Sequence, residues 1–177
     1  MPHVLVAFYS RTGTTRNVAR RIATALDADV LAITDAHPRK GVLGFMRSAI
    51  EAVRSSLPEI GPVWIDPIGY DLVVLGTPVW AGHVASPMRR YLHDHRNALP
   101  QVAFFCTMAG NNAANVFSDM RDVLGHEPIA TCAIHPKSMD ANSLDLAIEN
   151  FVSRLDPAIK QPPPPRGASG ESRHVGL

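Results

Sequence analysis

Short apolar runs recur along the chain, and the segments between them carry apolar residues at helical spacing. Five of these runs lack the polar alternation of a half-exposed strand, which is typical of strands buried on both faces of a sheet. They cover residues 4–8, 30–33, 72–75, 102–106 and 129–134. This pattern predicts an α/β fold in which helices cover both faces of a parallel sheet.

The helical segments between these runs have recognisable ends. Ser86 and Pro87 are expected at the cap and in the first turn of one helix, where the missing N–H of proline costs nothing. Gly125 is expected to end the next helix, and Pro157 the last one. Right-handed crossovers then limit the chain to a few doubly wound topologies. The expected helices contain residues 18–26, 42–53, 86–92, 114–124 and 144–155.

A chain of 177 residues suits one compact domain, which is predicted over residues 1–156. The rest, residues 157–177, contains four consecutive prolines and a Gly/Ser/Arg-rich run, so a disordered tail is predicted there. Within the domain, residues 58–69 form a long connection. Trp64 and Ile65 in this connection are expected to pack as a flap or a short edge strand.

Composition excludes several classes of protein. A net charge of +1 gives no strong field toward nucleic acid or a membrane surface. No apolar run is long enough to span a bilayer, and the N-terminus lacks the charged region of a signal peptide, so the expected location is the cytoplasm. Cys106 and Cys132 lie in apolar runs without a CxxC pairing. Two buried thiols are expected, with a disulfide or redox pair as the alternative.

The loop after the first predicted strand is rich in hydroxyl groups and opens a helix. Free backbone N–H groups and the helix dipole favour an anion at such a point, and hydroxyls add further donors. One hydroxyl would suffice for a helix cap, so four favour a bound phosphate over a cap alone. The loop matches neither the Walker phosphate loop nor the dinucleotide fingerprint. Its residues are Ser10, Arg11, Thr12, Gly13, Thr14 and Thr15.

A second loop is expected after the third strand, over residues 76–83. Trp80 falls here in a turn-forming context, where a large aromatic side chain could stack on a planar ring; the alternative is a tryptophan that closes the core. His83 either reaches the edge of a ligand or is solvated. The candidate ligand-contacting residues are Thr77, Pro78, Val79, Trp80, Ala81 and Gly82.

A third loop follows the fourth predicted strand. Its small residues and amides would let backbone groups approach the edge of a heteroaromatic ring, although a plain turn capped by asparagine is the alternative. The candidate residues are Thr107, Met108, Ala109, Gly110 and Asn111.

These loops carry a resemblance to the flavodoxin family over roughly residues 3–156. Residues 10–15 match the family's phosphate loop, [ST]-x-T-G-x-[ST], and residues 70–80 match its Y-D-x-(apolar)-G-[ST]-P-x-W signature. The resemblance implies a five-stranded sheet of order 2-1-3-4-5, with FMN at the switch point between strands one and three. It also implies that the phosphate lies on the first loop and the isoalloxazine between the second and third, beside Trp80.

The resemblance leaves the redox role open. Electron shuttles of this family look strongly acidic near the flavin, whereas this chain has nearly balanced charge and no Asp or Glu in residues 107–112. The prediction is therefore an FMN-dependent oxidoreductase that takes a hydride from NAD(P)H and reduces a quinone or similar acceptor. The alternatives are an electron-transfer protein serving redox partner proteins and a binding module without redox use. No catalytic side chain, metal or oligomeric state is predicted.

Overall fold

The computed structural model describes residues 3–36 and 56–160. Its parallel sheet has the order β2-β1-β3-β5-β6, and a short strand, β4, pairs antiparallel with the end of β3. Without β4, this is the predicted order 2-1-3-4-5, so the predicted fold is confirmed and one strand was missed. The strands are β1 (Val4–Tyr9), β2 (Asp29–Ile33), β3 (Leu72–Trp80), β4 (His83–Val84), β5 (Gln101–Thr107) and β6 (Thr131–Ile134).

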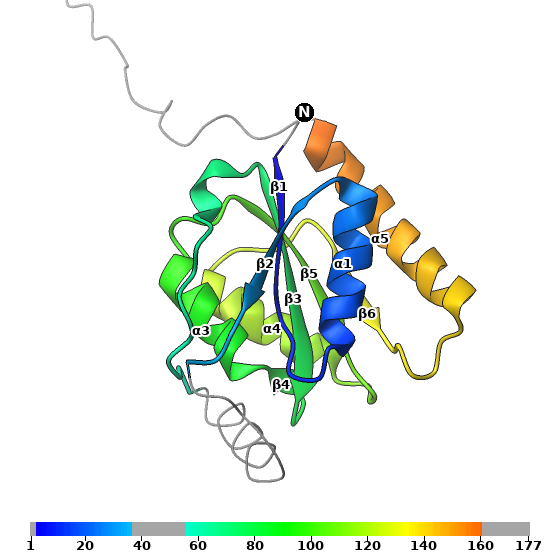
Figure 1. Cartoon of the computed structure of the whole chain (residues 1–177), viewed down its shortest axis with the longest axis horizontal. Coiled ribbons are helices and arrows are strands. Elements are labelled where there is room, and N and C mark those ends of the chain that lie inside the picture. The colour runs from blue at the N-terminus through cyan, green and yellow to red at the C-terminus, as the bar shows by residue number, and fades with distance from the viewer. Residues whose placement is uncertain (1–2, 37–55, 161–177) are drawn as a thin grey trace, which may run out of the picture.

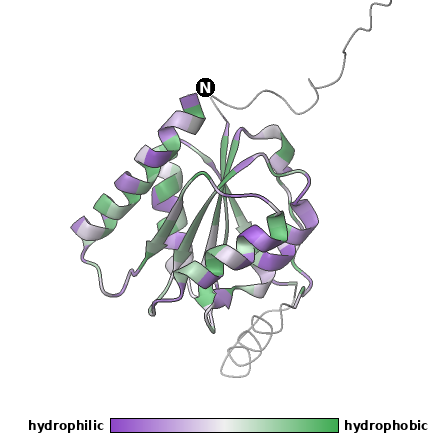
Figure 2. Ribbon diagram, turned by 180° about the vertical axis from the view of Figure 1, so that it is seen from behind, coloured by the Kyte–Doolittle hydropathy of each residue, from purple (hydrophilic) through white to green (hydrophobic). Residues whose placement is uncertain are grey.

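Four described helices cover the two faces of the sheet (Figure 1). The helices α1 (Thr14–Leu26) and α5 (Ala141–Lys160) pack on one face, whereas α3 (Ser86–His95) and α4 (Ala113–Leu124) pack on the other. Figure 2 shows largely hydrophobic strands between helices that turn polar residues outward. The predicted helix over residues 42–53 and residues 161–177 of the predicted tail lie outside the described residues, whereas residues 157–160 of that tail belong to α5.

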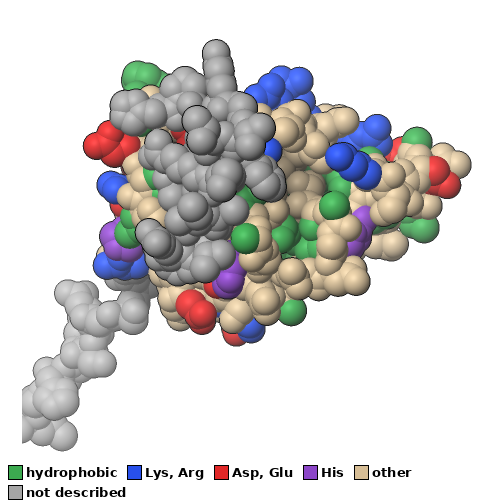
Figure 3. Space-filling view, turned by 90° about the horizontal axis from the view of Figure 1, so that it is seen from below, with side chains coloured by type: hydrophobic (Ala, Val, Ile, Leu, Met, Phe, Trp, Pro, Cys, Tyr) green, Lys and Arg blue, Asp and Glu red, His purple; other side chains and the backbone are tan. Residues whose placement is uncertain are grey.

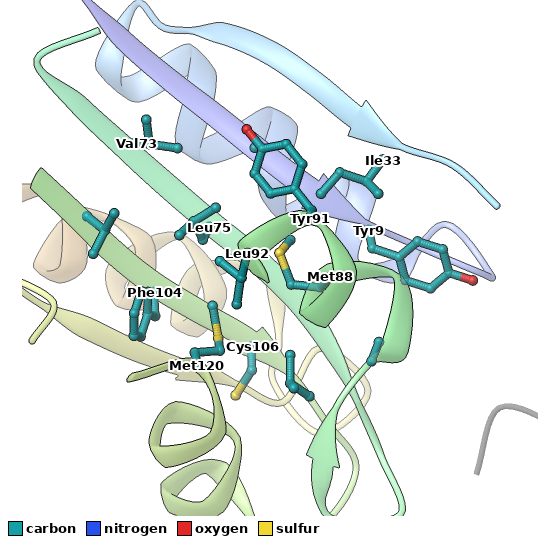
Figure 4. Packing of buried hydrophobic residues seen from close by; sticks show 14 of the residues in the cluster. Tyr9, Ile33, Val73, Leu75, Met88, Tyr91, Leu92, Phe104, Cys106 and Met120 are labelled. Atoms are coloured by element: carbon teal, nitrogen blue, oxygen red, sulfur yellow. The ribbon is translucent and has the colours of Figure 1, made fainter. Parts of the chain in front are cut away.

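Alternate residues of each central strand enter opposite cores. In β1, Leu5, Ala7 and Tyr9 enter the core under α3 and α4, hereafter the first core. Val4 and Phe8 enter the core under α1 and α5, hereafter the second core. Both faces of the strand are buried, and this is why the runs are apolar without alternation. Figure 4 shows the first core, in which side chains from α3 and α4 meet those of the strands.

The two cysteines lie on neighbouring strands but face different cores. Cys106 of β5 belongs to the first core and Cys132 of β6 to the second, and both are free thiols. Burial raises the pKa of Cys106 to about 12 and also raises the pKa of Cys132. The predicted pair of buried thiols is therefore confirmed, because the sheet separates the two sulfur atoms.

Two predicted helix ends are wrong. Ser86 lies inside α3, after Ala85, whose N–H donates to the hydroxyl of Thr77 at 3.2 Å. The last helix continues through Pro157 to Lys160. A proline in the last turn removes a single backbone bond, and Ile159 beyond it packs against the second core. This contact explains why the helix does not stop at the proline.

The connection before β3 is only partly as expected. It makes an isolated antiparallel bridge between Ile60 and Asp35, beyond the end of β2, and continues into a short 3₁₀ helix, η1 (Pro67–Gly69). Ile65 packs against the first core, but Trp64 is 85% exposed, so the prediction that Trp64 packs is wrong. No described helix has the length and apolar character that a membrane crossing requires.

Candidate functional site

Three loops gather at one edge of the sheet, at the lower end in Figure 1. They follow β1, β3 and β5, which are neighbours in the sheet and parallel. From β1 the chain crosses to β2 on one side and then returns to β3 on the other. Ligands of doubly wound sheets bind at such a switch point, outside the carboxyl ends of the strands.

The first loop is shaped by its own residues. Gly13 immediately precedes α1 with φ of 92°, in the left-handed region that favours glycine, and its N–H donates to Ser10 Oγ at 3.1 Å. The helix then begins at Thr14. Because the first N–H groups of a helix have no partner within it, the backbone of this first turn offers donors to an anion.

Apart from Ser10, which accepts from Gly13, the predicted hydroxyl groups of the first loop divide into an outer pair and one inner group. Thr12 Oγ1 and Thr14 Oγ1 lie 3.4 Å apart at the outer side of the loop. Thr15 is buried, and its Oγ1 lies 2.8 Å from Oγ1 of Thr107 at the end of β5. The outer pair and the first turn of α1 therefore form the open part of the loop, and the inner pair joins the first loop to the third.

The predicted second loop is wrong for most of its length, because β3 continues through residues 76–80. The chain then turns at Ala81 and Gly82 and returns as β4, with Val79 paired to Val84 and Trp80 to His83. Ala81 and Gly82 have φ of 48° and 85°. Two consecutive positive φ values are typical of a type I′ hairpin turn. Candidate residues Thr77 and Pro78 thus belong to a strand rather than to a loop.

Trp80 packs into the first core. It is 8% exposed, and its ring lies edge-on to that of Tyr9, with centroids 5.3 Å apart and planes at 90°. This arrangement corresponds to the alternative expectation of a tryptophan that closes the core. Stacking of Trp80 on a flavin stays a prediction.

The third loop lies against the hairpin turn. Met108 is buried and its N–H donates to the carbonyl of Ile134, whereas the next residues, 109–112, are exposed. A Cβ built on Gly82 would lie 3.1 Å from the side-chain amide of Asn112. The hairpin turn and the third loop are therefore adjacent. Figure 3 looks onto this edge, whose described surface is largely uncharged near its centre.

The sequence analysis missed Asp119, a carboxylate on α4 behind the hairpin. Its Oδ2 accepts from the N–H of Val84 at 3.1 Å and from Arg89 Nη2 at 3.1 Å, and it lies 3.0 Å from Nδ1 of His83. His83 is thus not simply solvated, and its contact with a ligand stays a prediction. Nothing in the sequence separates Asp119 from a solvated charge of an amphipathic helix, because its partners are 30 to 36 positions away in the chain.

The described residues contain no cluster of three or more His, Cys, Asp or Glu side chains that could hold a metal ion. The polar groups that the three loops present at this edge of the sheet are backbone N–H groups, hydroxyls and amides. At the first loop these groups offer donors to an anion, and at the third loop they lie in the exposed residues 109–112.

Known proteins share both the sequence pattern and the fold. A family model described as flavodoxin matches residues 3–150. A flavoprotein from Lactobacillus acidophilus, crystallised in complex with FMN, has 24% identity and a TM-score of 0.69, covering 85% of this chain and 99% of that one. The apo form of the flavoprotein from that organism, solved by NMR, has 26% identity and a TM-score of 0.61, covering 77% and 95%.

A flavodoxin, the WrbA-like protein from Agrobacterium tumefaciens, has 14% identity and a TM-score of 0.63, covering 92% of this chain and all of that one (100%). No curated protein matches the chain. The family match spans both signature motifs and most of the described strands and helices. The chain belongs to the flavodoxin family.

Proposed function

We propose that this chain binds FMN at the carboxyl edge of its sheet and acts as an FMN-dependent oxidoreductase, with NAD(P)H as the donor and a quinone or similar compound as the acceptor. The observation that carries the proposal is the geometry of the first loop. It combines the free N–H groups of a helix start, a left-handed glycine and two neighbouring hydroxyl groups in a flavodoxin sequence.

The first loop fits the phosphate of FMN. The first turn of α1 presents N–H donors together with the positive end of the helix dipole. Thr12 Oγ1 and Thr14 Oγ1 lie close enough together to donate to the same group. A Cβ built on Gly13 would meet no atom within 4 Å, so the space beside this residue is open. Thr15 supports the loop from below through Thr107.

The hairpin turn and the third loop fit the isoalloxazine ring. Ala81, Ala109, Gly110 and Asn111 are all exposed and, apart from Asn111, carry no polar side chain, so their backbone can approach a ring edge closely. The buried neighbours Trp80 and Met108 fix the two loops in the first core. These loops would hold and orient the ring, and no acid or base is required from the protein for this task.

Bound FMN would supply the electron transfer, and the surroundings supplied by the chain do not repel an anionic donor. Residues 107–112 include no carboxylate, and the net charge of the chain is +1. A pyridine dinucleotide carries negative phosphates, so its approach is not opposed by a strongly negative field. This absence of repulsion supports the reductase over an acidic shuttle. NAD(P)H, the quinone and the cytoplasmic location stay predictions.

The visible spectrum of the purified protein tests the cofactor, and chromatography of the released pigment identifies it. Steady-state oxidation of NAD(P)H, with and without a quinone, then tests the reaction. The proposal expects bound FMN and quinone-dependent oxidation. Bound FMN without such turnover would favour the electron-transfer alternative, and a colourless protein that takes up no FMN would favour the binding module.

A further inference from the structure

One oxygen atom of Asp119, Oδ2, interacts with three hydrogen-bond donors, which come from two neighbouring secondary-structure elements. The N–H of Val84 and the imidazole of His83 come from β4, and the guanidinium of Arg89 comes from α3. The carboxylate itself stands on α4 and is only 18% exposed. A carboxylate is an acceptor only, so Nδ1 of His83 must carry the hydrogen of that contact. Asp119 therefore ties the returning strand of the hairpin to both helices of this face.

The hairpin itself is short. It contains only two residue pairs, and a ribbon of this length is marginal by itself. Its turn also holds Ala81 at φ of 48°, which is unfavourable for a residue with a side chain. The remaining contacts of the hairpin include the Ala85 N–H bond to Thr77 and the neighbouring Asn112.

Arg89 makes the attachment strong. Its side chain is 8% exposed, and its Nε is buried with no hydrogen-bond partner among the described residues. A guanidinium in this setting depends on its counter-charge, because an unpaired buried charge is costly. Asp119 supplies that charge, and the same oxygen accepts from the backbone of β4. The position of the hairpin is thus coupled to a buried ion pair.

We infer that Asp119 is a positioning residue for the flavin ring: from α4 it holds the β3–β4 hairpin in the place where the turn at Ala81 and Gly82 faces the ring. This inference rests on the proposed function, because the ring is placed there by that proposal. Asp119 touches the hairpin and not the ring. It is distinct from the first loop, which is proposed to hold the phosphate.

The test compares Asp119→Asn with Asp122→Asn in the full chain freed of flavin. Asp122 is exposed on the same helix, so its substitution removes the same charge without touching the hairpin. Riboflavin carries the ring without the phosphate. Titrations followed by flavin fluorescence are expected to show that Asp119→Asn lowers the affinities for FMN and for riboflavin by the same factor, about tenfold or more. Asp122→Asn is expected to leave both affinities unchanged.

A second variant covers the event that Asp119→Asn fails to fold. Arg89→Met combined with Asp119→Asn removes both charges, so no unpaired guanidinium stays in the core. It is expected to fold and to show the same loss of riboflavin affinity. Hydrogen exchange at the amide of Val84 is expected to be faster in both variants, which reports the released hairpin directly.

The inference would be overturned by a folded variant in which the Val84 amide exchanges faster but the affinity for riboflavin is unchanged. Asp119 would then be purely structural. Loss of FMN affinity alone would also overturn it, because the effect would then lie at the phosphate. The parent chain is titrated first. If it binds neither flavin, the proposed function fails, and the inference that rests on it fails for that separate reason.

Discussion

The first loop and the β3–β4 hairpin lie at the same edge of the sheet, but they are held in different ways. The first loop is shaped mainly by neighbours in sequence: Gly13 donates to Ser10, and Thr12 lies against Thr14. Its one distant hydrogen-bond partner among the bonds described above is Thr107, which lies 2.8 Å from the buried hydroxyl of Thr15. The hairpin is shaped by distant residues, among them Tyr9 and Asp119. The proposed phosphate end of the site is therefore encoded mainly by local sequence, and the proposed ring end depends on tertiary packing.

Removing the outer hydroxyls of the first loop should have the largest effect. In Thr12→Ala/Thr14→Ala, two bonds to a phosphate dianion are lost, each worth about 1.5–3 kcal/mol. We expect FMN binding to weaken by about 3–6 kcal/mol in a fluorescence titration, while riboflavin binds the variant and the parent alike. Equal losses for both flavins would place these hydroxyls at the ring and remove the distinction between the two ends.

The next largest effect is expected on stability, where substitutions of the two tryptophans should have very different consequences. Trp80 is 8% exposed within the first core and Trp64 is 85% exposed. In urea unfolding, Trp80→Ala should lower the free energy of unfolding by about 3–5 kcal/mol. Trp64→Ala should change it by no more than about 0.5 kcal/mol. Similar values for the two variants would mean that the hairpin is not anchored in the core.

Sequence reading succeeded where the structure is local or periodic. The continuous runs identified the strands of the parallel sheet, and the hydroxyls around Gly13 identified the start of α1. It failed at the hairpin, because residues 76–80 were predicted to be a loop although they continue β3, with Pro78 inside the strand. The bonds of Asp119 to residues about 30 positions away could not be predicted, since only the folded topology brings α3, β4 and α4 together.

Glycine substitutions should show that the backbone of the first loop sets its shape. Gly13 has φ of 92°, whereas Gly110 of the third loop does not have a positive φ, and a Cβ on either residue would meet no atom within 4 Å. Gly13→Ala should therefore lower the free energy of unfolding by about 1 kcal/mol through conformation alone. Gly110→Ala should stay within about 0.5 kcal/mol of the parent. Identical urea midpoints for the two variants would contradict this account of the loop.

The smallest expected effect is a gain in stability at the hairpin turn. Ala81 has φ of 48°, so Ala81→Gly should relieve an unfavourable conformation and raise the free energy of unfolding by about 0.5 kcal/mol. Ala109 in the third loop has no positive φ, so Ala109→Gly should lower it by about 0.4–1 kcal/mol. Effects of the same sign would argue against the type I′ turn.

The central claim is that the first loop holds the phosphate of FMN while the hairpin and the third loop hold the ring. Paired titrations of the flavin-free protein with FMN and riboflavin, followed by flavin fluorescence, test it most directly. The account predicts that both bind in one equivalent and that FMN binds more tightly, by at least the roughly tenfold contribution of one bond to a charged group. Equal affinity for the two flavins, or no binding of either, would contradict it.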